Sequence, residues 1–421
     1  MSERTTRASA RPTAAVYAQG SKAWRNALFV IFASCGVPMA SIAARIPSIS
    51  NALSLTTGEV GLLLAGIAVG SVVGLLAAGH LVAIFGSRRT ILVAFVTAAL
   101  ALTVASFGIA VLGSFPLSFA GLIVFGSGFA TTDVAMNVSG AANERAIGRS
   151  IMPIFHAFFS FGTIIGAGAA ALAERLHVPL ELHMSIVSAV VIVAVLIALR
   201  YLRPEAPDTH DADGVEHPKT TFASRLAIWK EPRTILIGLI VLGMAFTEGS
   251  SNDWLSYAMV HGHGTDHATG AVVYSVFVAA MTVGRFSGVK LLDTFGRVPV
   301  LRGTAILAAV GLLLFIFVDV FWIDVVGAVF WGIGASLGFP VGMSAAADDP
   351  QKAAARVSAV ATIGYVAFLV GPPLIGFLGN EFGILHGLLL VLGLAALAGL
   401  VSFAAREPKP MPVGGDAAKA T

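Results

Sequence analysis

Two acidic side chains stand inside long apolar runs, and each precedes an amide by four residues. Asp133 precedes Asn137 in "FATTDVAMNV", and Glu248 precedes Asn252 in "TEGSSNDWL". Residues four apart share one face of a helix, so each acid points the same way as its amide. A carboxylic acid in a low-dielectric cavity can exchange protons near neutral pH, as a proton carrier must. We therefore predict Asp133 and Glu248 as proton-coupling residues, with His156, an imidazole that titrates near physiological pH, as a third.

The residues around these acids suit the recognition of a polyol. Hydroxyl groups exchange hydrogen bonds with acids and amides, and an apolar ring face packs on aromatic side chains. Tyr274 is one aromatic residue that could line such a cavity. The predicted substrate-binding residues are Asn137, Asn252, Asp253, Trp254, Tyr365 and Arg45.

Structural roles remain open for several of these residues. Asp133 could be a buried acid held by Asn137 or Arg45, and His156 could be a core histidine with satisfied hydrogen bonds. Arg45 ends an apolar run and could extend to water, rather than act as a counter-charge for Asp133 or Glu248. Glu248 could equally belong to a gate near the outer end of its helix.

The composition places these side chains in a membrane. Of the 421 residues, 57% are hydrophobic and 12% are charged, whereas soluble domains carry about 25% charged residues. A bilayer-spanning helix needs about 20 mostly apolar residues, and continuous apolar runs exclude a strand barrel. We predict an all-α membrane protein with twelve transmembrane helices in two pseudo-symmetric six-helix bundles, at 25–48, 58–82, 90–112, 115–140, 150–173, 183–203, 233–257, 268–292, 299–318, 321–346, 354–378 and 384–404.

Two observations divide and orient the chain. A polar, acidic stretch separates six spans from the other six and is typical of a linker. With the N-terminus in the cytoplasm, nearly all Lys and Arg residues fall on the cytoplasmic side, as the positive-inside rule requires. The expected parts are a cytoplasmic tail (1–24), an N-terminal bundle (25–203), a cytoplasmic linker (204–231), a C-terminal bundle (232–405) and a cytoplasmic tail (406–421).

Related stretches follow the second span of each half. "GHLVAIFGSRRT" and "LLDTFGRVPVLRG" occupy equivalent places, so that Gly86 aligns with Gly296. Parallel repeats of six spans are one way in which transporters are built, with the substrate site between the halves. Arg285 lies deep within its apolar run and should form a structural or gating ion pair, with Asp293 or with a residue of the eleventh span.

These stretches resemble the signature of the major facilitator superfamily between its second and third spans. Gly79, Gly86 and Arg88 match the signature, and Arg89 extends its basic pair. Ala83, Ile84 and Ser87 depart from it. The second copy keeps an Asp, a Gly and an Arg. With Arg285 added as a gating ion pair, the predicted latch and gating residues are Gly79, Gly86, Arg88, Arg89, Arg285, Asp293, Gly296 and Arg297.

Four further stretches narrow the resemblance: "TEGSSNDWL", "MTVGRFSG", "GASLGFP" and "GYVAFLVGPPLIG". Together they are similar to the fucose–proton-symporter branch of the superfamily, and to bacterial inner-membrane proteins of the MosC and YbjJ type. The resemblance implies alternating-access, proton-coupled symport of a small polar solute (sugar-, inositol- or rhizopine-like) across the inner membrane. In that branch an acid in this part of the fourth span handles protons, which supports Asp133. A proton-coupled efflux antiporter of a small organic compound is the alternative.

Other classes of function find less support. The sequence has no Gly-x4-Gly-Lys-Ser/Thr loop for ATP and no basic, aromatic pattern for nucleic acid. An embedded enzyme would need a nucleophile–base pair, and a sensor would need a signalling domain. A loop contains His261, His263 and His267 with Asp266. The loop is rich in glycine, exposed to solvent and without a cysteine of its own, which favours an ordinary loop over a metal site. We predict a non-enzymatic, monomeric carrier without cofactor or metal, whose partners are its solute, protons and the lipid bilayer.

Overall fold

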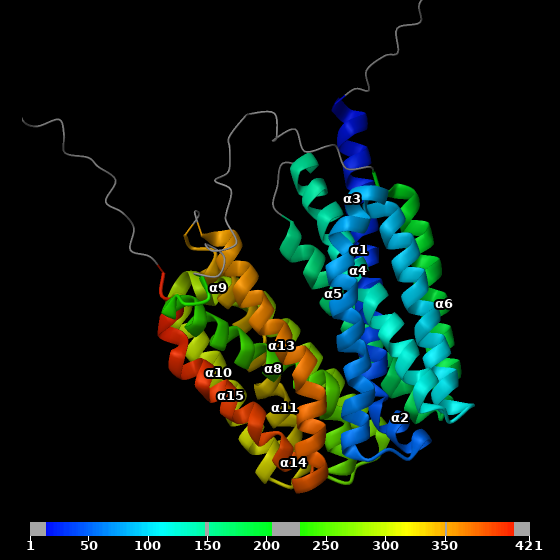
Figure 1. Cartoon of the computed structure of the whole chain (residues 1–421), viewed down its shortest axis with the longest axis vertical. Coiled ribbons are helices and arrows are strands. Elements are labelled where there is room, and N and C mark those ends of the chain that lie inside the picture. The colour runs from blue at the N-terminus through cyan, green and yellow to red at the C-terminus, as the bar shows by residue number, and fades with distance from the viewer. Residues whose placement is uncertain (1–13, 148–150, 204–227, 350–351, 408–421) are drawn as a thin grey trace, which may run out of the picture. The chain divides into compact units, whose positions relative to one another are not determined.

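The structure is a computed structural model that describes residues 14–147, 151–203, 228–349 and 352–407. Most of the expected tails 1–24 and 406–421 and of the linker 204–231 lies outside the described residues. Within them the chain is helical and has no strands (Figure 1). The elements are α1 (Ala14–Ala44), α2 (Ile46–Leu53), α3 (Thr57–Ala110), α4 (Phe115–Ile147), α5 (Met152–Arg175), α6 (Leu180–Ala198), η1 (Leu199–Tyr201), α8 (Pro232–His261), α9 (His267–Phe295), α10 (Arg297–Phe317), α11 (Phe321–Ala335), α12 (Gly338–Ala346), α13 (Ala353–Phe382), α14 (Ile384–Gly387), α15 (Leu389–Val401) and η3 (Ser402–Ala405).

The predicted all-α membrane fold with twelve spans is confirmed. Eleven helical segments in the described residues are long and apolar enough to cross a membrane. One of them, α3, joins two spans across Gly86, whose backbone is not helical. Helices dominate because lipid offers no hydrogen-bond partners, so each span must satisfy its own backbone groups.

Contacts group the chain into two compact units. Unit 1 comprises residues 1–42, 66–169 and 177–214, and unit 2 comprises residues 43–65, 170–176 and 215–421. Two short segments that precede the linker, 43–65 and 170–176, therefore pack with the second half of the chain. The boundaries predicted for two bundles, 25–203 and 232–405, remain predictions.

Unit 1 is held together by aliphatic and aromatic side chains from α1, α3, α4, α5 and α6. The rings of Phe32 and Phe155 stack at a centroid distance of 5.3 Å, both fully buried. Nearby, the indole Nε1 of Trp24 donates a hydrogen bond to the Ser139 hydroxyl across 3.0 Å. This core lies beside the span that carries Asp133, and it fixes α4 against α1 and α5.

Glycines allow α3 and α4 to approach each other closely within unit 1. A Cβ atom added to Gly70 would collide with the carbonyl oxygen of Ile123, and one added to Gly126 would collide with that of Ile67. Small residues let membrane helices approach in this way and gain dispersion contacts. The obstacles are backbone atoms, which cannot rotate aside.

Unit 2 has an aromatic core between α9, α10 and α11. The buried Trp331 lies 5.7 Å from Phe277 and 5.9 Å from Phe315, both with edge-on rings. Its indole Nε1 donates to the Thr247 carbonyl oxygen across 2.9 Å, which ties α11 to α8. In Figure 1, α10 and α15 lie side by side in the same unit. The core thereby fixes the part of α8 that carries Glu248.

We expect Gly70→Val to destabilise the purified protein, because the added side chain must push two backbones apart. Overpacking of this kind costs about 1–3 kcal/mol, so the thermal unfolding midpoint in detergent should fall by several degrees. Gly168→Val is the matched control, since nothing lies within 4 Å of a Cβ at that helical position. Equal midpoints for the two variants would contradict the proposed close approach.

Candidate functional site

Two polar pairs join α8 to α9 within their spans. Arg285 Nη2 lies 2.7 Å from Glu248 Oε1, with 31% and 18% of the two side chains exposed. One turn further along α8, the Tyr274 hydroxyl donates to Asn252 Oδ1 across 2.8 Å. Glu248 and Asn252 thus face the same neighbouring helix, as their spacing indicates. Two α8 side chains and two α9 side chains form one polar strip.

The acid found beside Arg285 is Glu248 of α8, whereas the expected partners were Asp293 or a residue of the eleventh span. Asp293 is exposed in the last turns of α9. Helical spacing suggested Asp293 because it lies two turns from Arg285 on the same helix. The neighbouring helix instead brings a carboxylate directly against the guanidinium.

The next two residues of α8 differ in their surroundings. Asp253 is partly exposed and interacts electrostatically with Tyr274, as Glu248 does. Trp254 is fully buried, and its ring meets that of Tyr257 edge-on at 5.5 Å. Asp253 therefore borders the polar strip, whereas Trp254 packs inside unit 2.

The acid–amide pair of unit 1 lies on α4. Asn137 Nδ2 donates to the Asp133 carbonyl oxygen across 2.8 Å and lies 3.3 Å from Asp133 Oδ1. Both side chains are partly exposed. His156 lies on α5, is exposed, and meets Phe32 edge-on at 5.4 Å. The partner of the Asp133 carboxylate is thus a neutral amide, whereas the partner of the Glu248 carboxylate is a cation.

Arg45 is buried in unit 2 beside an acid that the sequence did not single out. Its Nε lies 2.7 Å from Glu174 Oε1, at the end of α5. The suggested counter-charges were Asp133 and Glu248. Glu174 was missed because an acid next to Arg175 at the end of a span looks like an ordinary loop residue. Tyr365, on α13, is exposed.

The three histidines that follow one another near the end of α8 have separate partners. His261 stacks on Tyr257 at 4.2 Å, and His263 Nε2 lies 2.9 Å from the Phe315 carbonyl oxygen. His267 contacts side chains of α2. Among the described residues, no group of three or more His, Cys, Asp or Glu side chains could hold a metal ion.

The repeated glycines have nearly the same backbone geometry in both halves. Gly86 has φ 74° and ψ 157°, and Gly296 has φ 75° and ψ 171°. This region is essentially restricted to glycine, because a Cβ atom would clash there. The turn residues around them that were predicted as latch residues, namely Gly79, Arg88 and Arg89, are exposed.

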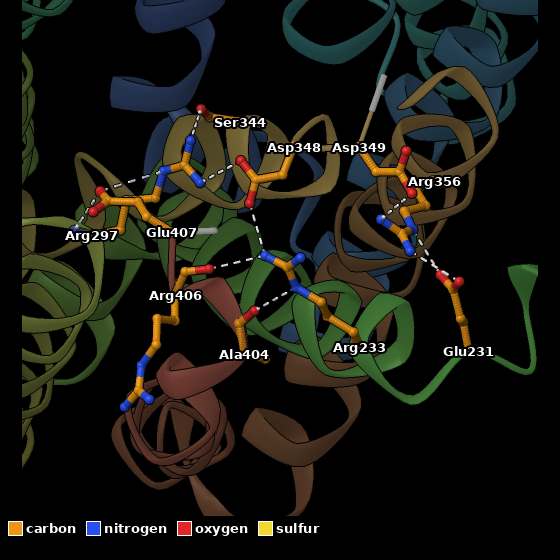
Figure 2. Close-up of polar contacts among 10 residues, drawn as sticks. All are labelled: Glu231, Arg233, Arg297, Ser344, Asp348, Asp349, Arg356, Ala404, Arg406 and Glu407. Atoms are coloured by element: carbon orange, nitrogen blue, oxygen red, sulfur yellow. Dashed lines mark hydrogen bonds and ion pairs between the residues drawn. The ribbon is translucent and has the colours of Figure 1, made fainter. Parts of the chain in front are cut away.

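In unit 2 the arginine of this turn enters an ion-pair network (Figure 2). Arg297 Nη1 lies 2.7 Å from Asp348 Oδ1, and its Nη2 donates to the Ser344 hydroxyl across 2.9 Å. Arg233 Nη2 reaches the other Asp348 oxygen at 2.8 Å and donates to the carbonyl oxygen of Arg406 at 3.0 Å. Asp348 therefore joins two guanidinium groups, and the network ties the ends of α8, α10, α12 and η3.

A second acid, Glu231, binds two cations of one segment. Figure 2 shows Arg356, which donates to both oxygens of Glu231 at 2.7 and 2.9 Å. Lys352 Nζ lies 2.8 Å from Glu231 Oε1. The hydrogen bonds from Arg356, and then from Lys352, lower the pKa of Glu231 to about 2. Glu231 and Asp348 were missed as site residues because acids at span ends resemble loop acids.

Known proteins are similar to this chain over most of its length. Residues 27–287 and 249–420 match the family described as Major Facilitator Superfamily. An uncharacterised MFS-type transporter of Yersinia pestis is 31% identical over 376 residues, which cover 87% of this chain and 93% of the relative. Membrane protein MosC of Rhizobium meliloti is 26% identical, with 91% and 90% covered.

Solved structures share the fold at low sequence identity. A nucleoside transporter, NupG, has a TM-score of 0.72 at 14% identity, with 92% of this chain and 98% of the other covered. A D-xylose-proton symporter has a TM-score of 0.70 at 13% identity, covering 93% and 98%. The Escherichia coli fucose:proton symporter FucP has a TM-score of 0.62 at 15% identity, covering 91% and 98%.

We expect Glu231→Gln to lower the thermal unfolding midpoint equally from pH 8 down to about pH 5. The native pKa of about 2 lies below the ordinary value of 4.5, so the carboxylate stabilises the fold above pH 4.5 and loses that effect as the pH falls towards 2. The difference between parent and variant should therefore shrink only below about pH 4.5. Glu381→Gln, at an exposed side chain that receives a 3.5 Å hydrogen bond from its neighbour Asn380, is the control and should change little. A difference that already disappears at pH 6 would contradict this assignment.

Proposed function

The chain belongs to the Major Facilitator Superfamily, and from this premise we propose that it carries a small polar solute together with protons by alternating access. The solute that we propose is sugar-, inositol- or rhizopine-like. The observation that supports this proposal most strongly is the pair of acid-bearing polar sites within the spans, Asp133–Asn137 in unit 1 and the Glu248–Arg285 strip in unit 2. Ionisable groups at bilayer depth are costly and are retained chiefly where they act on a solute or an ion.

The two acids are suited to different tasks. Protonation of Asp133 removes a charge whose partner is the neutral amide of Asn137, so among the described residues no cation is left without a counter-ion. Protonation of Glu248 would leave the Arg285 guanidinium beside a neutral acid, which is costly in a poorly solvated site. We assign proton carriage first to Asp133. We assign Glu248 a secondary coupling role, in which solute or a second proton breaks its ion pair with Arg285. His156, which is exposed, would relay protons.

The polar strip on α8 and α9 favours a hydroxyl-bearing solute. The Tyr274 hydroxyl occupies Asn252 Oδ1, so the amide NH₂ of Asn252 is the group directed to other acceptors. Asp253, partly exposed beside it, supplies an acceptor for hydroxyl protons. A ring that carries several hydroxyl groups can use both, and the titles of the structural neighbours mention nucleoside, fucose and D-xylose.

We place the carrier in the bacterial inner membrane with both termini in the cytoplasm, following the distribution of Lys and Arg. In this orientation the Asp348 network of Figure 2 and the turns at Gly86 and Gly296 lie on the cytoplasmic side. The predicted latch would act there, with Arg297 bound to Asp348 in unit 2. Arg88 and Arg89, exposed at the equivalent turn, hold the orientation of unit 1.

The solute is found first by a thermal-shift screen of L-fucose, D-xylose, myo-inositol, amino-inositols, uridine and a lipophilic cation. Ligand stabilises the protein by RT ln(1 + [L]/Kd), so even a millimolar ligand is visible at high concentration. Stabilisation by the lipophilic cation alone would favour the efflux antiporter instead of the symporter.

Asp133→Asn should then lower the rate of uptake driven by an inward proton gradient in proteoliposomes by about tenfold or more. The amide keeps the shape of the acid but cannot carry a proton, so exchange of solute across the membrane without a gradient should persist. Asp319→Asn is the matched control and should keep gradient-driven uptake. If gradient-driven uptake by Asp133→Asn equals that of the parent, the assignment of proton carriage to Asp133 is refuted.

A further inference from the structure

Two arginines at one end of unit 2 have no acidic partner among the described residues. Arg302 lies in the second turn of α10, and Arg406 directly follows η3, which continues α15. Helices α10, α15 and η3 contain no Asp or Glu residue. The Arg302 side chain bonds only to a hydroxyl, and Arg406 bonds only through its backbone. Both positive charges are therefore available to an anion that comes from outside the protein.

The neighbouring arginines at this end are already paired. Arg233 and Arg297 lie 2.8 and 2.7 Å from the two oxygens of Asp348. Glu407 follows Arg406 in sequence, but its carboxylate accepts from the Arg297 backbone N–H at 3.3 Å and lies 4.0 Å from Arg297 Nε. Figure 2 shows the Arg406 side chain extending away from both acids. The acids of this network thus serve Arg233 and Arg297 and leave Arg406 unpaired.

A buried hydroxyl fixes the direction of the Arg302 guanidinium. Arg302 Nε donates to Ser402 Oγ across 3.0 Å, and Ser402 is fully buried at the start of η3. Because Nε is used in this way, the two Nη groups of the exposed arginine remain for another acceptor. At about 2 Å per residue of 3₁₀-helix, Ser402 and Arg406 are only about 8 Å apart along the backbone. Both guanidinium groups can therefore reach one headgroup.

Exposed apolar faces run from these arginines along α10 and α15, which lie side by side (Figure 1). The exposed residues of each face recur every three or four positions, so they follow one side of a helix. The α10 stripe comprises Ile306, Val310, Leu313 and Phe317. The α15 stripe comprises Leu389, Gly393, Ala396, Leu400 and Phe403. From Arg302 to Leu313 the helix rises about 16 Å, which matches half of a hydrocarbon core about 30 Å thick.

An exposed tryptophan marks the level of the lipid headgroups near these arginines. Trp229 precedes α8 and is 46% exposed, and indole side chains of this kind concentrate at the membrane–water interface. The start of α8 is joined to η3, because Arg233 Nε donates to the Ala404 carbonyl oxygen across 3.2 Å. The segment that carries Arg406 therefore lies close to the headgroup level.

We propose that Arg302 and Arg406 bind the headgroup of an anionic phospholipid, whose acyl chains lie along the α10 and α15 stripes. A guanidinium donates paired hydrogen bonds to phosphate oxygens, and basic side chains between spanning helices hold anionic headgroups in this way. A zwitterionic phospholipid carries its own cation, which two unpaired arginines repel. The site therefore selects for net negative charge on the lipid.

Native mass spectrometry of the purified full chain in detergent tests this site. Palmitoyl-oleoyl phosphatidylglycerol is the probe, and phosphatidylcholine with the same acyl chains is the reference. An arginine near the headgroups strengthens anionic lipid binding about fivefold, so the parent should prefer phosphatidylglycerol about twenty-five-fold. Arg302→Gln and Arg406→Gln should each lower this preference about fivefold. Arg175→Gln, which removes an exposed arginine from the last turn of α5, is the matched control and should keep it.

A further variant separates a built site from attraction by net charge. Ser402→Ala keeps every charge but releases Arg302 Nε, so the preference should fall about threefold as the guanidinium loses its fixed direction. An unchanged preference in Ser402→Ala, no preference in the parent, or an equal loss in Arg175→Gln would overturn the proposal.

Inorganic phosphate distinguishes a lipid site from a site for free phosphate. Added in large excess, it should leave phosphatidylglycerol bound, because it has no acyl chains to cover the two stripes. Complete displacement of the lipid would assign the arginines to free phosphate and overturn the lipid proposal. These measurements use neither solute nor a proton gradient, so their outcome is independent of the proposed proton-coupled uptake.

Discussion

The ion pair between Glu248 and Arg285 is the condition on which the middle of unit 2 depends. Either charge alone would be left in a poorly solvated part of a membrane span, and breaking a fully buried pair costs about 3–5 kcal/mol. The partial exposure of both side chains, 18% and 31%, reduces that cost without removing it. The pair therefore fixes α9 beside α8, and the same registration places Tyr274 against Asn252. The side chains of this polar strip are therefore already paired with one another in the absence of solute.

The acid within the spans of unit 1, Asp133, differs from Glu248 in its partner. Asp133 has an amide partner, Asn137, in the part of the structure that is described, so its charge can change without leaving a cation unpaired. This difference separates the two acids, which the sequence presents as equivalent acid–amide pairs. It leads us to treat Asp133 as the proton carrier and Glu248 as the anchor of the solute-facing strip.

Local patterns in the sequence predicted much of this arrangement, and tertiary packing accounts for the rest. Apolar run length predicted the spans, and the matching turns predicted that Gly86 and Gly296 are equivalent, which their φ and ψ values bear out. The four-residue spacing correctly placed each amide near its acid or on its face. The partners of Arg45, Arg285 and Arg297 were not predictable, because Glu174, Glu248 and Asp348 come from other segments of the chain. An acid at a span end looks the same in sequence whether it faces water or a guanidinium.

Solute-driven proton movement tests the central claim most directly. Proteoliposomes containing the parent protein and a trapped pH-sensitive dye would receive the stabilising solute outside, with no initial pH difference and with the membrane potential clamped. We predict that the lumen acidifies at a rate that saturates with solute concentration, because each inward cycle carries a proton. Solute entry without any change in luminal pH would contradict proton-coupled symport, and alkalinisation of the lumen would indicate exchange of solute for protons.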